Sequence, residues 1–129
     1  MEVTRIIHPI GQGAFYTESI KTNDNLYNVV YDCGSGNHKY TPKRLKQDIA
    51  SFYNPDDVID LLFISHFDND HINGIRELKK RTSNIRNIVV PLIEENDFWY
   101  YQIENPSFET FYRSLSEIAD SAVYRVKPY

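Results

Sequence analysis

Residues 61–71, with the sequence LLFISHFDNDH, constrain this chain more than any other stretch. The stretch opens with four apolar residues, as in a strand that is covered on both faces. Its last six positions hold two imidazoles and two carboxylates, at His66, Asp68, Asp70 and His71. This order predicts a polar site directly after a buried strand.

Side chains of these types are the usual ligands of divalent metal ions. In an extended loop, alternation would aim His66, Asp68 and Asp70 the same way. His71 would turn toward a second position, so that either one ion or two would fit. The alternative is a polar loop after a core strand, in which Asp70 caps the next helix and both histidines are solvated.

Length and composition narrow the class of protein. The 129 residues suffice for one domain with its own core, and we expect a single unit over residues 1–129. A net charge of -4, from 14 Lys and Arg against 18 Asp and Glu, gives the whole chain no basic field for nucleic acid. The lone Cys33 excludes an internal disulfide and a cysteine-based zinc site. No apolar run suggests a signal segment or a membrane span, so we expect a cytoplasmic protein without a membrane partner.

The first part of the chain has the pattern of a meander. Apolar residues and turn formers alternate in a way that predicts three antiparallel strands, at residues 2–7, 14–20 and 26–31. A helix should follow at Thr41 and Pro42, with the hydroxyl as N-cap and the proline at the first helical position.

The second part has the pattern of an α/β unit. The order strand, helix, strand over residues 60–65, 75–80 and 85–90 predicts a parallel pair of strands. A further helix at residues 108–118 and a last strand at residues 123–126 are expected from their apolar spacing.

Three short motifs follow one another along the chain: GQG at residues 11–13, DCG at residues 32–34 and SHFDNDHING at residues 65–74. In this order they resemble the metallo-β-lactamase fold hydrolases. Within that superfamily, the glycine turn and Asp68 are most similar to the hydrolase domain of bacterial competence DNA-uptake proteins (ComEC-type). Ala14 stands where that group usually has an aspartate.

The resemblance implies an α/β fold that is half of a metallo-β-lactamase αββα sandwich, a mixed sheet with flanking helices. It implies that His66 and Asp68 hold a first divalent metal ion. A second ion would bind at Asp70 and His71, and Asp70 would also orient the water that the ions activate. Because Asp68 is a harder ligand than an imidazole, the preference among manganese, zinc, magnesium and iron shifts away from zinc.

The family completes its metal site with histidines and an aspartate from later in the chain, and no histidine follows His71 here. The resemblance therefore implies that residues 1–129 are the N-terminal part of such a domain. We expect the remainder of the domain, or a second chain, to cover the sheet.

Two upstream residues are candidates for supporting the metal ligands. Asp32 can accept an imidazole proton from a metal-bound histidine, or it can form an Asx-turn beside Gly34. His8 ends the first strand beside the glycine turn, where it can face the site or simply bond to the backbone.

These observations lead to two functions of different classes. The first is a metal-dependent hydrolase, a phosphodiesterase or nuclease that acts on nucleic acid or nucleotides through a metal-activated water. The aspartate at position 68 favours these substrates over thioesters and lactams. The second is a non-catalytic interaction or regulatory module that keeps half of the fold with an incomplete metal centre. If the metal centre is complete, we expect an enzyme. If it is incomplete, we expect tight binding to another chain.

Overall fold

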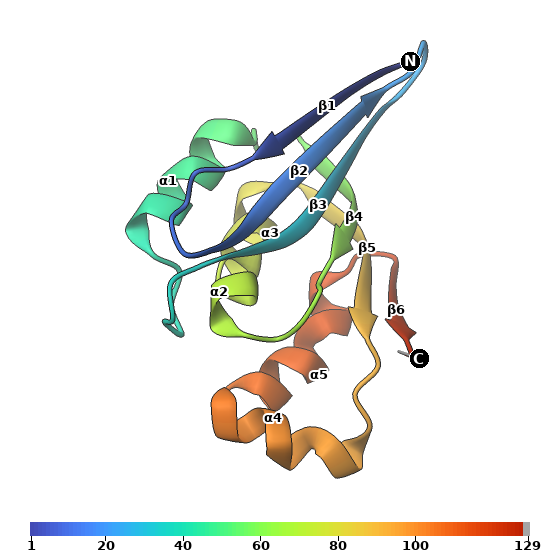
Figure 1. The fold of residues 1–129 in the computed structure, drawn as a ribbon. Helices are drawn as coiled ribbons and strands as arrows, with labels where there is room; N and C mark the ends of the chain where they lie inside the picture. The colour runs from blue at the N-terminus through green and yellow to red at the C-terminus, as the bar shows by residue number, and fades with distance from the viewer. Residues whose placement is uncertain (128–129) are drawn as a thin grey trace.

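The computed structural model describes residues 1–127, in which six strands form one sheet with helices packed against it (Figure 1). The predicted fold class, a mixed sheet with flanking helices, is confirmed. The elements are β1 (Glu2–Ile7), β2 (Gly13–Lys21), β3 (Leu26–Ser35), α1 (Lys43–Phe52), β4 (Val58–Phe63), α2 (Asn69–Ile72), α3 (Ile75–Arg81), β5 (Asn84–Pro91), the 3-10 turn η1 (Glu95–Asp97), α4 (Phe98–Glu104), α5 (Phe108–Ile118) and β6 (Ala122–Val126). Among the described residues, no helix has the length and apolar character needed to cross a membrane.

The strands are hydrogen-bonded in the order in which they follow along the chain. Short turns connect β1, β2 and β3, which pair antiparallel, as predicted. Helix-containing segments connect β3, β4, β5 and β6, which pair parallel. The predicted parallel pair, β4 with β5, is confirmed. Because β3 and β4 run in the same direction, their carboxyl ends lie at the same edge of the sheet.

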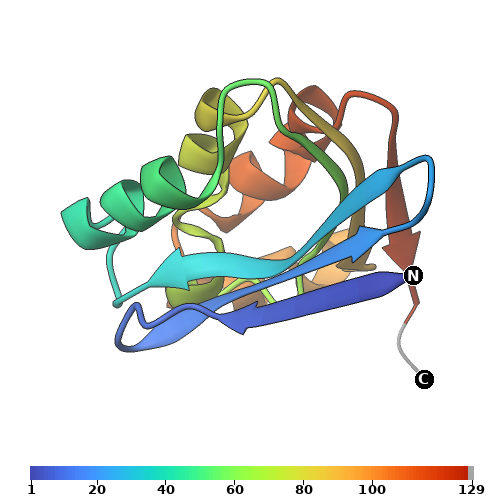
Figure 2. The same ribbon diagram turned by 90° about the horizontal axis from the view of Figure 1, so that it is seen from above.

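One face of the sheet is covered far better than the other. Helices α1, α3 and α5 lie along one face (Figure 2). The central strands bury these side chains under the helices: Val30, Ile59, Leu62, Ile85 and Ile88. On the opposite face Leu61 and Phe63 are partly buried, and Tyr31 is 45% exposed. The sequence predicted that the strand at residues 60–65, which corresponds to β4, is covered on both faces. Within residues 1–127 that prediction is wrong.

The start of α1 also differs from the prediction. Pro42 takes the N-cap position, so Thr41 lies outside the helix. The hydroxyl of Thr41 donates to the carbonyl oxygen of Asn73, at 2.5 Å. Thr41 thus ties the start of this helix to the segment after α2, where we expected it to cap its own helix.

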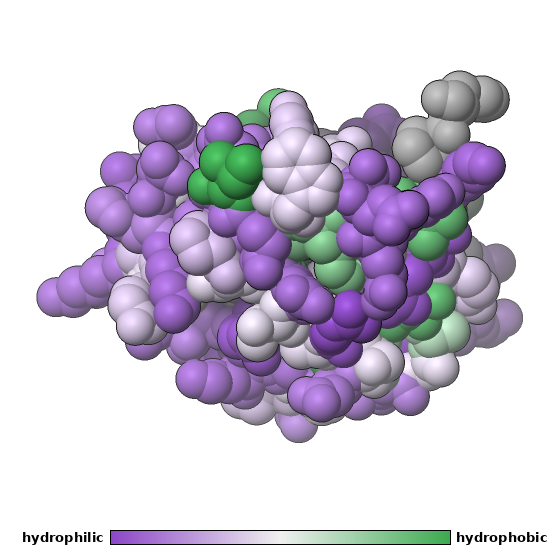
Figure 3. Space-filling view, turned by 90° about the horizontal axis from the view of Figure 1, so that it is seen from below, coloured by the Kyte–Doolittle hydropathy of each residue, from purple (hydrophilic) through white to green (hydrophobic). Residues whose placement is uncertain are grey.

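Helix α4 is rich in aromatic residues and is an element that the sequence patterns do not predict. Phe98 is buried and meets Phe108 of α5 edge to face, with ring centroids 5.4 Å apart. Trp99 and Tyr100 are 66% and 60% exposed. Figure 3 shows the surface at this end of the molecule, where hydrophobic atoms lie scattered among hydrophilic ones.

Candidate functional site

The candidate ligands lie where β3 and β4 end. The loop after β4 carries His66 and Asp68, and the short helix α2 carries Asp70 and His71. Asp32 comes from the last part of β3. The extended geometry that we expected for the ligand loop is wrong at Asp70, because this residue is helical.

A β-bulge in β3 places Asp32 at the site. The register of β2 with β3 shifts between Phe15 and Tyr16, so that Asp32 is an extra residue without a partner in β2. Its φ of 56° lies in the left-handed region, which costs a residue with a side chain roughly 1 kcal/mol or more. Bulges bend a strand and redirect a side chain. Here the redirected carboxylate meets the loop after β4.

The carboxylate of Asp32 is buried and fixes the orientation of His71. Ser65 donates to it through its backbone N–H, at 2.7 Å, and through its hydroxyl, at 2.5 Å. Nδ1 of His71 lies 2.8 Å from the same carboxylate. Because an ionised carboxylate accepts and cannot donate, the neutral form of His71 that fits this contact has its proton on Nδ1 and a lone pair on Nε2. This is the tautomer in which Nε2 can bind a metal ion.

The four candidate ligands lie near one another but form two pairs. In the inner pair, Nε2 of His71 lies 3.7 Å from an oxygen of Asp70. In the outer pair, Nδ1 of His66 lies 3.9 Å from an oxygen of Asp68. The two imidazoles meet edge to face, with centroids 3.8 Å apart. The outer pair is the more exposed, since the side chain of Asp68 is 70% accessible and that of Asp70 is 22% accessible.

The structure gathers these residues without assembling them into one ligand set. Within residues 1–127, no three His, Cys, Asp or Glu side chains converge closely enough to hold a metal ion. Cys33 is no candidate, because burial raises the pKa of its thiol and keeps it protonated at neutral pH. The role of each histidine and aspartate as a ligand stays a prediction.

An acidic cavity of about 240 Å³ adjoins the two pairs. Its lining consists of polar and acidic residues: Gln12, Asn37, Asp68, Asn69, Asp70 and Glu104. Glu104, at the end of α4, is a further carboxylate that the motifs do not reveal, because it lies far from them along the chain. The negative lining favours cations over anions.

Two glycines allow α2 to lie directly against the strand ends. A Cβ atom on Gly34 would lie 2.6 Å from the carbonyl oxygen of Asp70. A Cβ atom on Gly13 would lie equally close to the same oxygen. Any side chain at these positions would therefore displace α2. The GQG and DCG motifs thus position the helix that carries Asp70 and His71.

Asn73 joins the end of α2 to the end of β3. Its side-chain oxygen accepts from the backbone N–H of Ser35, at 2.9 Å. Its amide donates to the carbonyl oxygens of Ser35 and His38, at 2.8 and 2.9 Å. Sequence reasoning singled out neither Asn73 nor Ser65 as a supporting residue. The available signal was their place inside the third motif, next to the candidate ligands.

His8 lies away from the two pairs. Its Nε2 is 2.9 Å from the hydroxyl oxygen of Thr17, and its ring stacks on Phe15 with centroids 4.1 Å apart. Burial lowers the pKa of His8, and the carboxylate of Asp48 partly opposes this shift. Of the two predicted supporting residues, the structure brings Asp32 to the candidate ligands and leaves His8 in contact with the core.

Comparison with known families agrees with the motifs and the fold. A family model of the metallo-beta-lactamase superfamily matches residues 22–116, a range that holds β3, β4 and all four candidate ligands. No curated protein and no solved structure matches the chain. The match covers more than half of the chain, and the resemblance to competence proteins within the superfamily stays a prediction. The chain belongs to the metallo-beta-lactamase superfamily.

Proposed function

We propose that the protein is a metal-dependent hydrolase that cleaves phosphodiester bonds in nucleic acid or nucleotides. Membership of the superfamily implies metal-dependent hydrolysis in general. The observation that carries the proposal is the hydrogen bond between the buried carboxylate of Asp32 and Nδ1 of His71. A carboxylate that orients a histidine in this way is a common support of a metal-bound imidazole.

The donor atoms of the two pairs fit a divalent ion by their chemistry. Neutral imidazoles and ionised carboxylates bind such ions in proteins. We assign His66, Asp68, Asp70 and His71 as the residues that would hold one or two ions. Because no three donors converge within residues 1–127, the proposal needs further ligands. We assign these to the remainder of the domain or to a second chain that covers the open face of the sheet.

A bound divalent ion would supply a water of lowered pKa and would stabilise negative charge on the attacked phosphate. The residues of the chain have separate tasks in this proposal. Asp32 would keep the proton on Nδ1 of His71, so that the lone pair of Nε2 would be free to bind the ion. Asp70 would accept a hydrogen bond from the attacking water and orient it. Asp68 adds a hard oxygen donor, which favours manganese, magnesium or iron over zinc.

The test is cleavage of DNA and of a dinucleotide, in buffer with manganese, by the protein together with the remainder of the domain or the second chain that supplies the further ligands. We expect His71→Ala to reduce the rate by about 100-fold, because it removes a ligand together with the group that Asp32 orients. His38→Ala is the matched control, since His38 is an exposed histidine in the loop after β3, and it should cleave at the wild-type rate. Cleavage by His71→Ala at the wild-type rate would contradict the assignment.

The alternative is a non-catalytic module that binds a second chain. Two observations favour it: the lack of a group of three ligands within residues 1–127, and the partly exposed aromatic face at Tyr31 and Phe63. Anomalous diffraction at the manganese absorption edge separates the two functions. An ion beside the inner and outer pairs supports the hydrolase. A metal-soaked crystal without such an ion, together with a stable complex with another chain, supports the module.

A further inference from the structure

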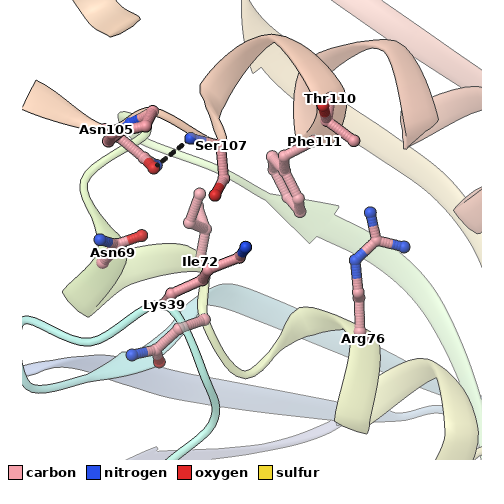
Figure 4. A pocket seen from close by; sticks show the side chains of 10 residues that line it. Lys39, Asn69, Ile72, Arg76, Asn105, Ser107, Thr110 and Phe111 are labelled. Carbon is pink, nitrogen blue, oxygen red and sulfur yellow. Dashed lines mark hydrogen bonds between the residues drawn. The ribbon is translucent and has the colours of Figure 1, made fainter. Parts of the chain in front are cut away.

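A second cavity lies between α2, α3 and the start of α5 (Figure 4). Its volume is about 310 Å³, larger than that of the acidic cavity. The polar residues that matter for its chemistry are Lys39, Asn69, Arg76, Asn105, Ser107 and Thr110. Figure 4 shows Lys39 and Arg76 entering the space from one side and Ser107 from the other.

The charge of this cavity is opposite to that of the chain as a whole. The chain carries 18 acidic against 14 basic residues, yet the ionisable side chains that line the cavity, Lys39 and Arg76, are both cationic. The remaining lining residues within the described part of the chain are neutral. Such a cavity attracts anions and repels the cations that the acidic cavity attracts.

Arg76 and Ser107 are the hydrogen-bond donors of the cavity whose contacts bear most on ligand binding. Arg76 donates through Nη2 to the buried hydroxyl oxygen of Ser114, at 3.0 Å, which orients a guanidinium with five N–H donors. Ser107 occupies the N-cap of α5 but makes no capping hydrogen bond with its side chain. Its hydroxyl is therefore available to a ligand at the positive end of the dipole of α5.

The cavity also adjoins the candidate metal centre. Asn69, the first residue of α2, lines both this cavity and the acidic one. It stands in the chain between Asp68 and Asp70. A ligand with two charged groups could therefore place a phosphate on the basic side of Asn69 while a second group reaches the acidic side.

We propose that the cavity between α2, α3 and α5 is a binding site for a phosphate group. Arg76 supplies a planar pair of N–H donors that matches two phosphate oxygens. Lys39 adds a second positive charge, and Ser107 and Thr110 add hydroxyl donors. This site goes beyond the proposed hydrolase function, because it binds phosphate without a metal ion. In a nucleotide substrate it would hold a phosphate next to the bond that is cut.

The test is a titration of the metal-free protein with inorganic phosphate in buffer that contains EDTA, at constant ionic strength kept with chloride. Amide NMR signals of Asn69, Ser107 and Thr110 should shift with saturation. Arg76→Gln should weaken the binding on the order of tenfold, as expected for the loss of a charged hydrogen-bond donor. Arg76→Lys keeps the charge and should restore part of the affinity.

Lys21→Gln removes the same charge at the exposed end of β2, remote from the cavity, and should leave the affinity unchanged. Lys39→Gln provides a second variant in case Arg76→Gln unfolds, and we expect it to weaken binding by a few-fold. Shifts at Asn69, Ser107 and Thr110 that do not saturate would overturn the proposal. Equal weakening by Arg76→Gln and Lys21→Gln would also overturn it, because it would show a general charge effect. Because the titration contains no metal, its failure leaves the hydrolase proposal standing.

Discussion

The two histidines of the third motif are close in sequence and differ in how they are held. The side chain of His71 is 21% accessible and bonds to a carboxylate that is 1% accessible. The side chain of His66 is 47% accessible and lies 3.9 Å from Asp68, which is itself largely exposed. His71 of the inner pair is therefore held in a fixed orientation before any ligand arrives. The outer pair can change its geometry at little cost.

The difference comes from long-range structure. Parallel pairing of β3 with β4 places Tyr31 opposite Phe63, and the bulge then brings Asp32 to the loop that begins after Phe63. Ser65 and His71 both bond to Asp32. A group that is oriented before binding loses less conformational entropy when a ligand arrives. In the proposed hydrolase, we expect Asp32 of β3 to set the affinity for the ion and the loop after β4 to adapt to it.

The largest effect on stability is expected at Asp32, because its carboxylate holds His71 and Ser65. Asp32→Ala should lower the free energy of unfolding by about 3 kcal/mol, because the partly buried N–H of Ser65 and Nδ1 of His71 lose their buried acceptor. Asp68→Ala should change it by less than about 0.5 kcal/mol, as is usual for an exposed side chain. Urea denaturation measures both. Losses of equal size in the two variants would show that the inner pair is no better held than the outer one.

The second effect concerns the close contact between Gly34 of β3 and the backbone of Asp70 in α2. Gly34→Ala should destabilise the protein by about 2 kcal/mol, because the new methyl group would overlap the backbone of Asp70. Gly11→Ala is the control, because a Cβ atom on Gly11 would meet no other atom within 4 Å. Unlike Gly34, Gly11 has a positive φ, of 81°. That variant should cost about 1 kcal/mol through backbone strain alone. A Gly34→Ala protein as stable as the Gly11→Ala protein would mean that α2 can move without penalty.

The sequence was sufficient for the parts of the fold that local patterns determine. The meander, the parallel pair and the helix at residues 108–118 follow from apolar periodicity and turn residues, and the structure confirms them. Helix α4 was not predicted, because consecutive aromatic residues give no helical period. The run LLFI did not reveal that β4 is buried on one face and only partly buried on the other. An apolar run shows that a strand is hydrophobic, but it does not show which elements pack on each face.

The candidate site could be located from sequence but its geometry could not. The motif at residues 65–74 names the loop and the helix that carry the four candidate ligands. The bulge at Asp32 was not predictable, because it depends on how two strands pair. Thr41 shows the same limit: its pattern with Pro42 is that of a helix cap, yet its hydroxyl bonds to Asn73 across the fold.

The third effect concerns the negative charge of Asp32, which Asp32→Asn removes while the size of the side chain stays nearly the same. Asparagine tolerates the left-handed backbone at position 32. Its neutral amide, however, is a weaker acceptor than a carboxylate and holds the proton on Nδ1 of His71 less well. We expect the affinity for manganese, measured by calorimetry, to fall about tenfold. Asp24→Asn removes the same charge in the exposed turn after β2 and should leave the affinity unchanged. An unaltered affinity in Asp32→Asn would mean that Asp32 supports the fold and not the ion.

The smallest effect tests the buried histidine outside the two pairs. Burial lowers the pKa of His8 below its ordinary value of 6.5, so the unfolded chain binds a proton at a higher pH than the folded protein does. The free energy of unfolding should therefore fall as the pH drops from about 6.5 toward the pKa of the folded state. His8→Gln keeps a donor near Thr17 and removes the titrating group, so its stability should depend less on pH in this range. Denaturation at pH 7.5 and at pH 5.5 measures the difference, and equal pH dependence in both proteins would show that His8 is solvated in the folded state.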